Sequence, residues 1–199
     1  KIFLGFAVVI IAFGSASSYS IYRLNEHRES VAIIWQEVNP MSLELRRKLR
    51  EVQAQDEYLG GTQRNSDIEY IQRALPKLKV FEKFREIESR IDDVLSRGKL
   101  GGTDKQSLLG VKKELVAFRE GTELYRTVKG RDVELPEQSA EELYSFLVNQ
   151  VVTYAKQGRL HSSTPELAVL RRSLRKISHL IIEIEKNLND QVQTLDKHT

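Results

Sequence analysis

The chain has 199 residues, with 31 Lys and Arg against 28 Asp and Glu, a formal net charge of +3, and no cysteine. The lack of cysteine excludes disulfides, thiolate nucleophiles and most structural zinc sites. Because basic and acidic residues are interleaved throughout, the charge pattern does not indicate nucleic acid as a partner. We expect no catalytic centre, metal or cofactor in this segment, since it has no glycine-rich phosphate loop and no Glu-x-x-His pair.

The first feature along the chain is an uncharged run of 21 residues, Ile2 to Tyr22, flanked by basic residues. As a helix with a rise of about 1.5 Å per residue, a run of this length spans the roughly 30 Å hydrocarbon layer of a bilayer. We therefore predict a transmembrane helix over residues 1–23, with tyrosines where it leaves the membrane. The alternative is a cleaved signal peptide, because small residues follow the apolar stretch IFLGFAVVIIAF.

The next stretch predicts a long helix with the seven-residue repeat of coiled coils. Its apolar residues recur at intervals of seven, at Leu24, Val31, Val38, Leu45, Val52 and Leu59, and the steps between them are filled by Ile34, Trp35, Met41 and Leu49. Pro40 lies inside this pattern, so we expect a kink there rather than two separate elements. Gly60 and Gly61 end the helix.

Three capping-box sequences, in which Ser or Thr is followed three residues later by Glu or Gln, predict helix starts. They lie at Ser66–Glu69, Thr103–Gln106 and Ser139–Glu142. From them we predict a second long helix that contains Pro76 and ends at Gly98, a third helix that reaches Gly130, and a shorter helix that ends at Gly158.

Thr164 and Pro165 predict the start of a last helix, as its N-cap and first-turn residues. This helix carries the most regular apolar stripe of the chain, at Leu167, Leu170, Leu174, Ile177, Ile181, Ile184, Leu188, Val192 and Leu195. The stripe has the spacing of a left-handed helical bundle.

No strand-like alternation competes with these helices, so the predicted fold is all-α. We expect the N-terminal transmembrane helix to continue into an elongated antiparallel four-helix-type bundle, residues 24–199, with an extra short helix at residues 139–157. Five full antiparallel passes would leave the C-terminus far from the membrane. We therefore expect the short helix to be a distal insertion or a partial pass.

This organisation resembles the extracytoplasmic helical-bundle sensor module of bacterial transmembrane sensor histidine kinases. The likeness covers the whole chain as a pattern, and it is carried by the segment KIFLGFAVVIIAF, the passage through IYRL into heptads, the Asn39-Pro40 step and the closing stripe LRRSLRKISHLIIEIEKNL. It implies a homodimer in the bacterial inner membrane, with residues 24–199 extracytoplasmic. It also implies a second membrane helix after Thr199 and, beyond it, cytoplasmic kinase domains that this segment does not contain.

Two other functions fit the same pattern. One is the ligand-binding domain of a methyl-accepting chemotaxis receptor, whose sensor domain is similar in organisation. The other is a membrane-anchored coiled-coil protein that does not signal and has a structural or adhesive role.

Two basic clusters provide a candidate ligand site, one in the first predicted helix and one in the last: Arg46, Arg47, Lys48 and Arg50, and Arg171, Arg172, Arg175 and Lys176. If these helices pack together, guanidinium groups would form a bidentate site for a carboxylate or phosphate. The candidate residues for such a small anionic ligand are Arg47, Arg50, Arg171 and Arg175. The alternatives are a solvated charged surface and, as the source of the signal, a periplasmic partner protein.

Overall fold

The computed structural model describes residues 2–61, 65–98, 100–128, 135, 137–160 and 164–196, without the side chains of residues 2–10, 23, 26–27, 65–67 and 194–196. All regular structure in these ranges is helical, so the all-α prediction is confirmed. The elements are α1 (Ile2–Ile33), the π-helical η1 (Ile34–Val38), α2 (Asn39–Gly61), α3 (Asn65–Ala74), the 3₁₀-helical η2 (Leu75–Lys77), α4 (Val80–Ser96), α5 (Gly102–Glu120), α6 (Glu123–Val128), α7 (Ala140–Lys156) and α8 (Pro165–Asp196). Because α1, η1 and α2 are continuous, the described residues form seven separate helices.

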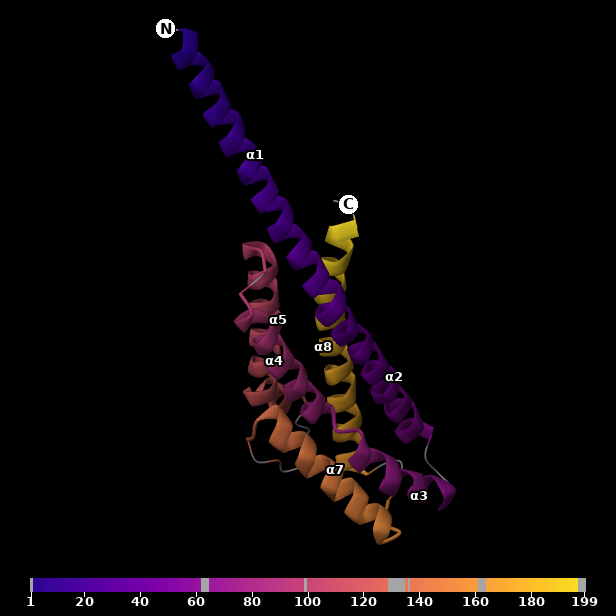
Figure 1. Cartoon of the computed structure of the whole chain (residues 1–199). Coiled ribbons are helices and arrows are strands. Elements are labelled where there is room, and N and C mark those ends of the chain that lie inside the picture. The colour runs from indigo at the N-terminus through magenta and orange to yellow at the C-terminus, as the bar shows by residue number, and fades with distance from the viewer. Residues whose placement is uncertain are drawn as a thin grey trace.

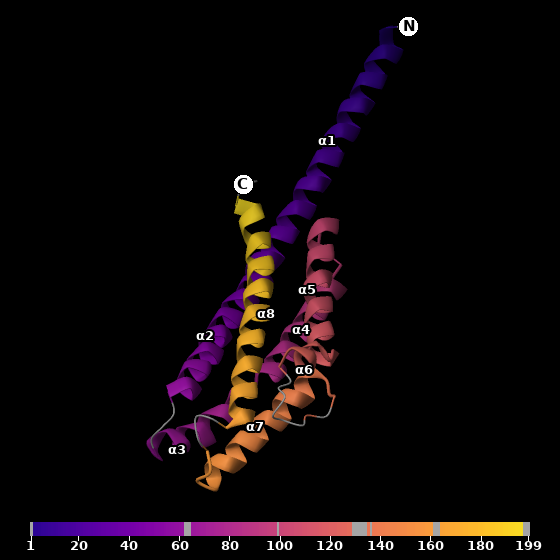
Figure 2. The same cartoon turned by 180° about the vertical axis from the view of Figure 1, so that it is seen from behind.

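The helices form an elongated bundle in which α2, α4, α5 and α8 run lengthwise (Figure 1). α3 and α7 lie obliquely at the end away from the N-terminus, which we call the distal end. α1 extends beyond the other helices at the opposite end, and the last described turn of α8 points to that same end (Figures 1 and 2). The most extensive packing between two helices is that of α2 against α8.

A π-helical segment accommodates Pro40 in the first long helix. Proline has no N–H to donate, and its ring clashes with the carbonyl four residues earlier in a regular α-helix. The backbone N–H of Asn39, the residue before it, bonds to the Ile34 carbonyl five residues back, which is the π-helical pattern. The prediction that Pro40 does not divide the helix is confirmed.

The two predicted apolar stripes meet in the hydrophobic core. Val38, Leu45, Val52 and Leu59 of the first helix are buried, and so are the stripe residues of α8 from Leu167 to Val192. Leu195 lies outside the described side chains. This apolar interface between α2 and α8 stabilises the bundle, because apolar burial dominates the favourable free energy of folding.

Two residues of the predicted stripe are not in the core. Leu24 is 55% exposed, because it lies in the part of α1 that extends beyond the bundle. Trp35 is 43% exposed. It lies in the π-helical segment, where the wider turn alters which face of the helix each residue occupies. The prediction that these side chains fill the stripe is wrong.

The predicted second and third helices are each divided in two, so these predictions are wrong. The second is interrupted after η2, where Lys79 has a left-handed conformation with φ 45° and ψ 44°. The third is interrupted at Gly121, whose extended conformation would bring a Cβ into collision with the Ala117 carbonyl oxygen. The apolar periodicity continues across both breaks, which is why it did not reveal them.

The three predicted capping boxes have different outcomes. The box at Ser139–Glu142 is formed at the start of α7. The box at Thr103–Gln106 is not, because α5 begins at Gly102 with Gly101 as an N-cap that has no side-chain bond. The box at Ser66–Glu69 depends on Ser66, whose side chain lies outside those described. The predicted end of the third helix, Gly130, likewise lies outside the described residues. Gly98 and Gly158, both with positive φ, follow α4 and α7 as predicted.

Among the residues with described side chains, no helix is both long enough and apolar enough to cross a membrane. The predicted transmembrane helix, residues 1–23, depends strongly on Ile2 to Ile10, which lie outside those side chains.

Candidate functional site

The predicted arginines of α8 converge on one carboxylate of α2. The Nε atoms of Arg171 and Arg175 donate to Asp56 Oδ1 and Oδ2 at 3.0 Å and 2.8 Å. Gly60, one turn after Asp56, makes room for this arrangement, because a Cβ there would lie 2.5 Å from a terminal nitrogen of Arg171. Asp56 therefore holds the two guanidinium groups in place at the interface of α2 and α8.

The predicted arginines of α2 have other neighbours. Arg47 and Arg50 are exposed, and Arg47 lies 3.9 Å from the Glu51 carboxylate on the next turn. No contact described in the structure joins Arg47 or Arg50 to Arg171 or Arg175. An anion bound by all four residues stays a prediction.

A second candidate site is a groove of about 280 Å³ between the start of α4 and the first half of α7. Its polar lining comprises Lys79, Glu82, Arg85, Glu141, Ser145 and Asn149, and its apolar lining comprises Pro76, Val80, Phe81, Tyr144 and Val148. The groove lies at the distal end, and below we call it the distal groove.

Tyr144 is the most unusual residue of the distal groove. Its side chain is 6% exposed, and its buried hydroxyl has no hydrogen-bond partner in the described structure. Its ring packs against Phe81 with 5.5 Å between centroids. Burial raises the pKa of the Tyr144 phenol above its usual value, so the group stays neutral and keeps its proton to donate.

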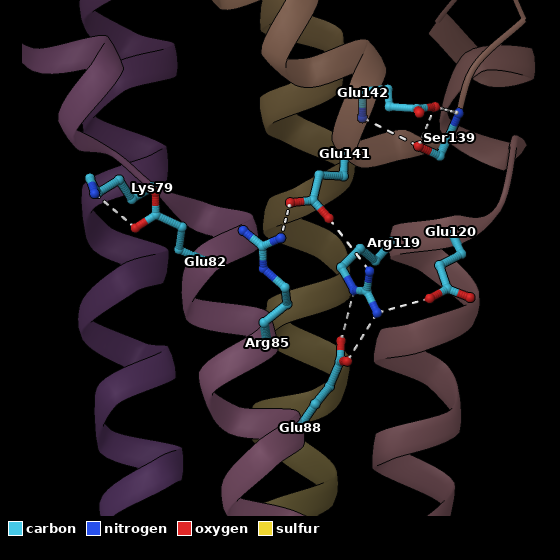
Figure 3. Close-up of polar contacts among 9 residues, drawn as sticks. All are labelled: Lys79, Glu82, Arg85, Glu88, Arg119, Glu120, Ser139, Glu141 and Glu142. Atoms are coloured by element: carbon cyan, nitrogen blue, oxygen red, sulfur yellow. Dashed lines mark hydrogen bonds and ion pairs between the residues drawn. The ribbon is translucent and has the colours of Figure 1, made fainter.

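An ion-pair cluster lies beside the distal groove and joins α4, α5 and α7 (Figure 3). Arg119 of α5 forms a bidentate pair with Glu88 of α4, with both distances 3.2 Å. Its other guanidinium nitrogen lies 3.5 Å from Glu141 of α7, whose second oxygen lies 3.1 Å from Arg85. Glu141 is thus held between arginines of two different helices, which fixes α7 relative to α4 and α5.

The capping box positions Glu141 at the start of α7. The Ser139 hydroxyl accepts a hydrogen bond from the Glu142 N–H at 3.3 Å, and the Ser139 N–H donates to Glu142 Oε2 at 3.1 Å. The hydrogen bonds from Ser139 lower the pKa of Glu142 below its usual value. This motif sets the first turn of the helix, and with it the direction of Glu141.

Two contacts connect the turn between α4 and α5 to the first long helix. The Gly101 N–H donates to the Ser30 hydroxyl at 3.0 Å, and Arg97 Nη1 donates to Glu37 Oε1 at 2.9 Å. Ser30 precedes the π-helical segment and Glu37 lies in it. The turn therefore holds this helix at and before the irregular segment.

The sequence predicted neither the groove nor the ion-pair cluster. The capping box marked the start of α7 correctly, but the partners of Glu141 come from helices that are distant in the sequence. In the part of the chain that the structure describes, no group of three or more His, Asp and Glu residues is placed to hold a metal ion. No protein-family model matches the chain, and no curated protein or solved structure is significantly similar to it.

Proposed function

We propose that this chain is the signal-input domain of a membrane-bound two-component sensor histidine kinase, with residues 24–199 outside the cytoplasm. The observation that carries the proposal is the continuity of α1, η1 and α2. One unbroken helix leads from an uncharged apolar segment into the bundle, where it packs along α8, and α8 returns to the same end.

The exposed apolar side chains of α1 support a membrane anchor. Ile11, Phe13, Tyr19, Ile21 and Tyr22 are 60 to 75% exposed, although side chains of this kind are normally buried. They belong to the uncharged run that begins at Ile2. A lipid environment would cover these side chains, and the tyrosines would lie at its polar boundary.

The proposed mechanism is a small displacement of α2 against α8. A ligand or partner protein that binds one arrangement of the bundle more tightly shifts the population toward that arrangement. Because both helices continue toward the same end, the displacement passes to the membrane segments and then to kinase domains in a homodimer. A small anion at Arg171 and Arg175, or a periplasmic protein, would supply the differential binding.

Cysteine labelling tests the anchor and the topology, because these 199 residues contain no cysteine. In intact cells, Leu43→Cys, at an exposed position of α2, should react with a membrane-impermeant maleimide, whereas Phe13→Cys should react only after detergent is added. Equal labelling of both positions without detergent would contradict the anchor. A mature N-terminus near Ser17 or Ser18 would instead identify a cleaved signal peptide.

A further inference from the structure

The first long helix does not follow its own sequence repeat through the π-helical segment. The repeat of seven places Val31 on the core face, one interval before Val38. In the structure the buried residue is Ser30, which is 3% exposed, whereas Val31 is only partly buried. The step from Ser30 to Val38 is eight residues instead of seven, so the π-helical segment adds one residue to the repeat.

Trp35 is displaced from the core face in the same way. The equivalent residue two intervals of seven further on is Leu49, which packs against the core. Trp35 is instead 43% exposed, and the fully buried side chain is that of Ile34, one residue earlier. One residue corresponds to about 100° of rotation in a regular helix. The part of the helix before the π-helical segment is thus turned by about that angle relative to a regular helix of the same sequence.

Different groups favour the π-helical and the regular arrangement. Pro40 favours the π-helical one, because in a regular helix its ring would clash with the carbonyl four residues earlier. The π-helical arrangement also contains the hydrogen bond from the Gly101 N–H to the Ser30 hydroxyl, at 3.0 Å. The regular arrangement would bury more of Val31 and Trp35, and burial of apolar side chains is favourable. Neither arrangement satisfies all of these groups.

We propose that this helix has two registers, the π-helical one described and a regular α-helical one, and that the change between them turns α1 by about 100° about its axis. Both registers keep Val38 and Leu45 in the core, so α2 stays packed on α8 while α1 turns. Such packed interfaces change between discrete arrangements rather than continuously.

The turn between α4 and α5 would control the register. In the regular register Ser30 rotates away from Gly101, so their hydrogen bond belongs to the π-helical register alone. A ligand or partner protein that moves this turn would therefore change the populations of the two registers. Transfer of the rotation through the membrane to a kinase rests on the proposed function, whereas the existence of two registers does not.

Trp35 reports the register directly, because it is the single tryptophan of these 199 residues. Pro40→Ala removes the obstacle to a regular helix, so it should favour the regular register. In the full chain in detergent micelles, quenching of Trp35 fluorescence by iodide should weaken at least about twofold, because a rotation of about 100° takes the ring from the exposed face to the interface. The matched control is Pro76→Ala, at an exposed proline of η2, which should leave the quenching unchanged.

Cysteine reactivity measures the rotation independently. In the π-helical register Ser30→Cys should react more slowly with a soluble maleimide than Val31→Cys, because position 30 is the more buried of the two. Addition of Pro40→Ala should reverse this order. Val31→Ser combined with Pro40→Ala removes the apolar side chain that favours the regular register, and it should restore the quenching of Trp35.

Unchanged iodide quenching in Pro40→Ala, an unchanged order of cysteine reactivity, or quenching that Val31→Ser does not restore would each overturn the inference. Unfolding of a variant would expose Trp35 and strengthen the quenching, which is the opposite of the expected result. A change of register that leaves histidine phosphorylation of the full-length protein unchanged would keep the two registers and count against the proposed function.

Discussion

Glu37 accepts a hydrogen bond from Arg97 at 2.9 Å, and this contact joins the π-helical segment of the first long helix to the turn between α4 and α5. One residue of register is about 100° of rotation in a helix of 3.6 residues per turn. A π-helical segment that moved along the helix would therefore rotate α1 against α2. The contact of Glu37 with Arg97 opposes that movement.

Removal of this contact should loosen the segment without unfolding the domain. Both side chains are partly exposed, so Arg97→Ala should lower global stability by less than about 1 kcal/mol. We expect faster amide hydrogen exchange at Ile34–Val38 in the variant. Arg126→Ala, which removes an exposed pair with Glu137, is the control, and identical exchange in both variants would show that Arg97 does not hold the segment.

Arg119→Ala should destabilise the distal end strongly. The variant leaves Glu88, which is 8% exposed, without its bidentate partner, and breaking such a buried pair costs about 3 kcal/mol. Chemical denaturation measures the loss. Arg126→Ala should cost less than about 1 kcal/mol in the same assay, and a similar small value for Arg119→Ala would show that the cluster does not stabilise the fold.

Truncation of α8 side chains should have very different effects on stability according to their burial. Ile177 is fully buried, so Ile177→Ala should cost about 2 to 5 kcal/mol. Ile182, on the same helix and 42% exposed, provides a control with the same chemical change, and Ile182→Ala should cost less than about 1 kcal/mol. Thermal and denaturant unfolding measure both losses. If Ile177→Ala and Ile182→Ala lowered the stability equally, α8 would be rotated about its axis relative to the orientation described.

Glu114 should give the bundle a defined pH dependence. Burial, and then repulsion from Glu183, raise the pKa of Glu114 in the folded state above its usual value of 4.5. The folded state therefore binds the proton more tightly than the unfolded state, and stability is lost as the pH rises from the unfolded pKa through the folded one.

Glu114→Gln should thus stabilise the protein at pH 7, by less than about 1 kcal/mol because the group is half-buried, and should have little effect below pH about 4. Glu183→Gln should act in the same direction by removing the repulsion. The control is Glu57→Gln, an exposed position of α2. Unfolding curves at both pH values test this, and stabilisation by Glu114→Gln that is equal at both pH values would exclude the titration as its cause.

The sequence predicted those parts of the fold that depend on periodicity and local capping. The stripes around Val52 and Ile177 and the capping box of Ser139 are properties of neighbouring residues, and the structure confirms them. The breaks at Lys79 and Gly121 were not predicted, because Leu75, Leu78 and Phe81 continue a helical spacing through a backbone that is not helical throughout.

The candidate sites depend on contacts between distant residues, and a single sequence does not reveal these. Arg171 and Arg175 were identified as a basic cluster, but their partner Asp56 lies more than 100 residues earlier. Tyr144 has the helical spacing of an ordinary core residue, and only the assembled groove shows that its hydroxyl lacks a partner.

The proposed control of a kinase by displacement of α2 against α8 is tested most directly by locking the two helices together. Arg46→Cys on α2 and Glu185→Cys on α8 replace an ion pair, so a short bis-maleimide can bridge them. Lys112→Cys with Asp92→Cys, which replaces the ion pair between α5 and α4, provides the matched control. In membrane vesicles that contain the full-length protein, ATP-dependent histidine phosphorylation should change at least about threefold when α2 is bridged to α8 and stay constant when α4 is bridged to α5. Equal phosphorylation in the two bridged proteins, or none in the unbridged one, would contradict the account.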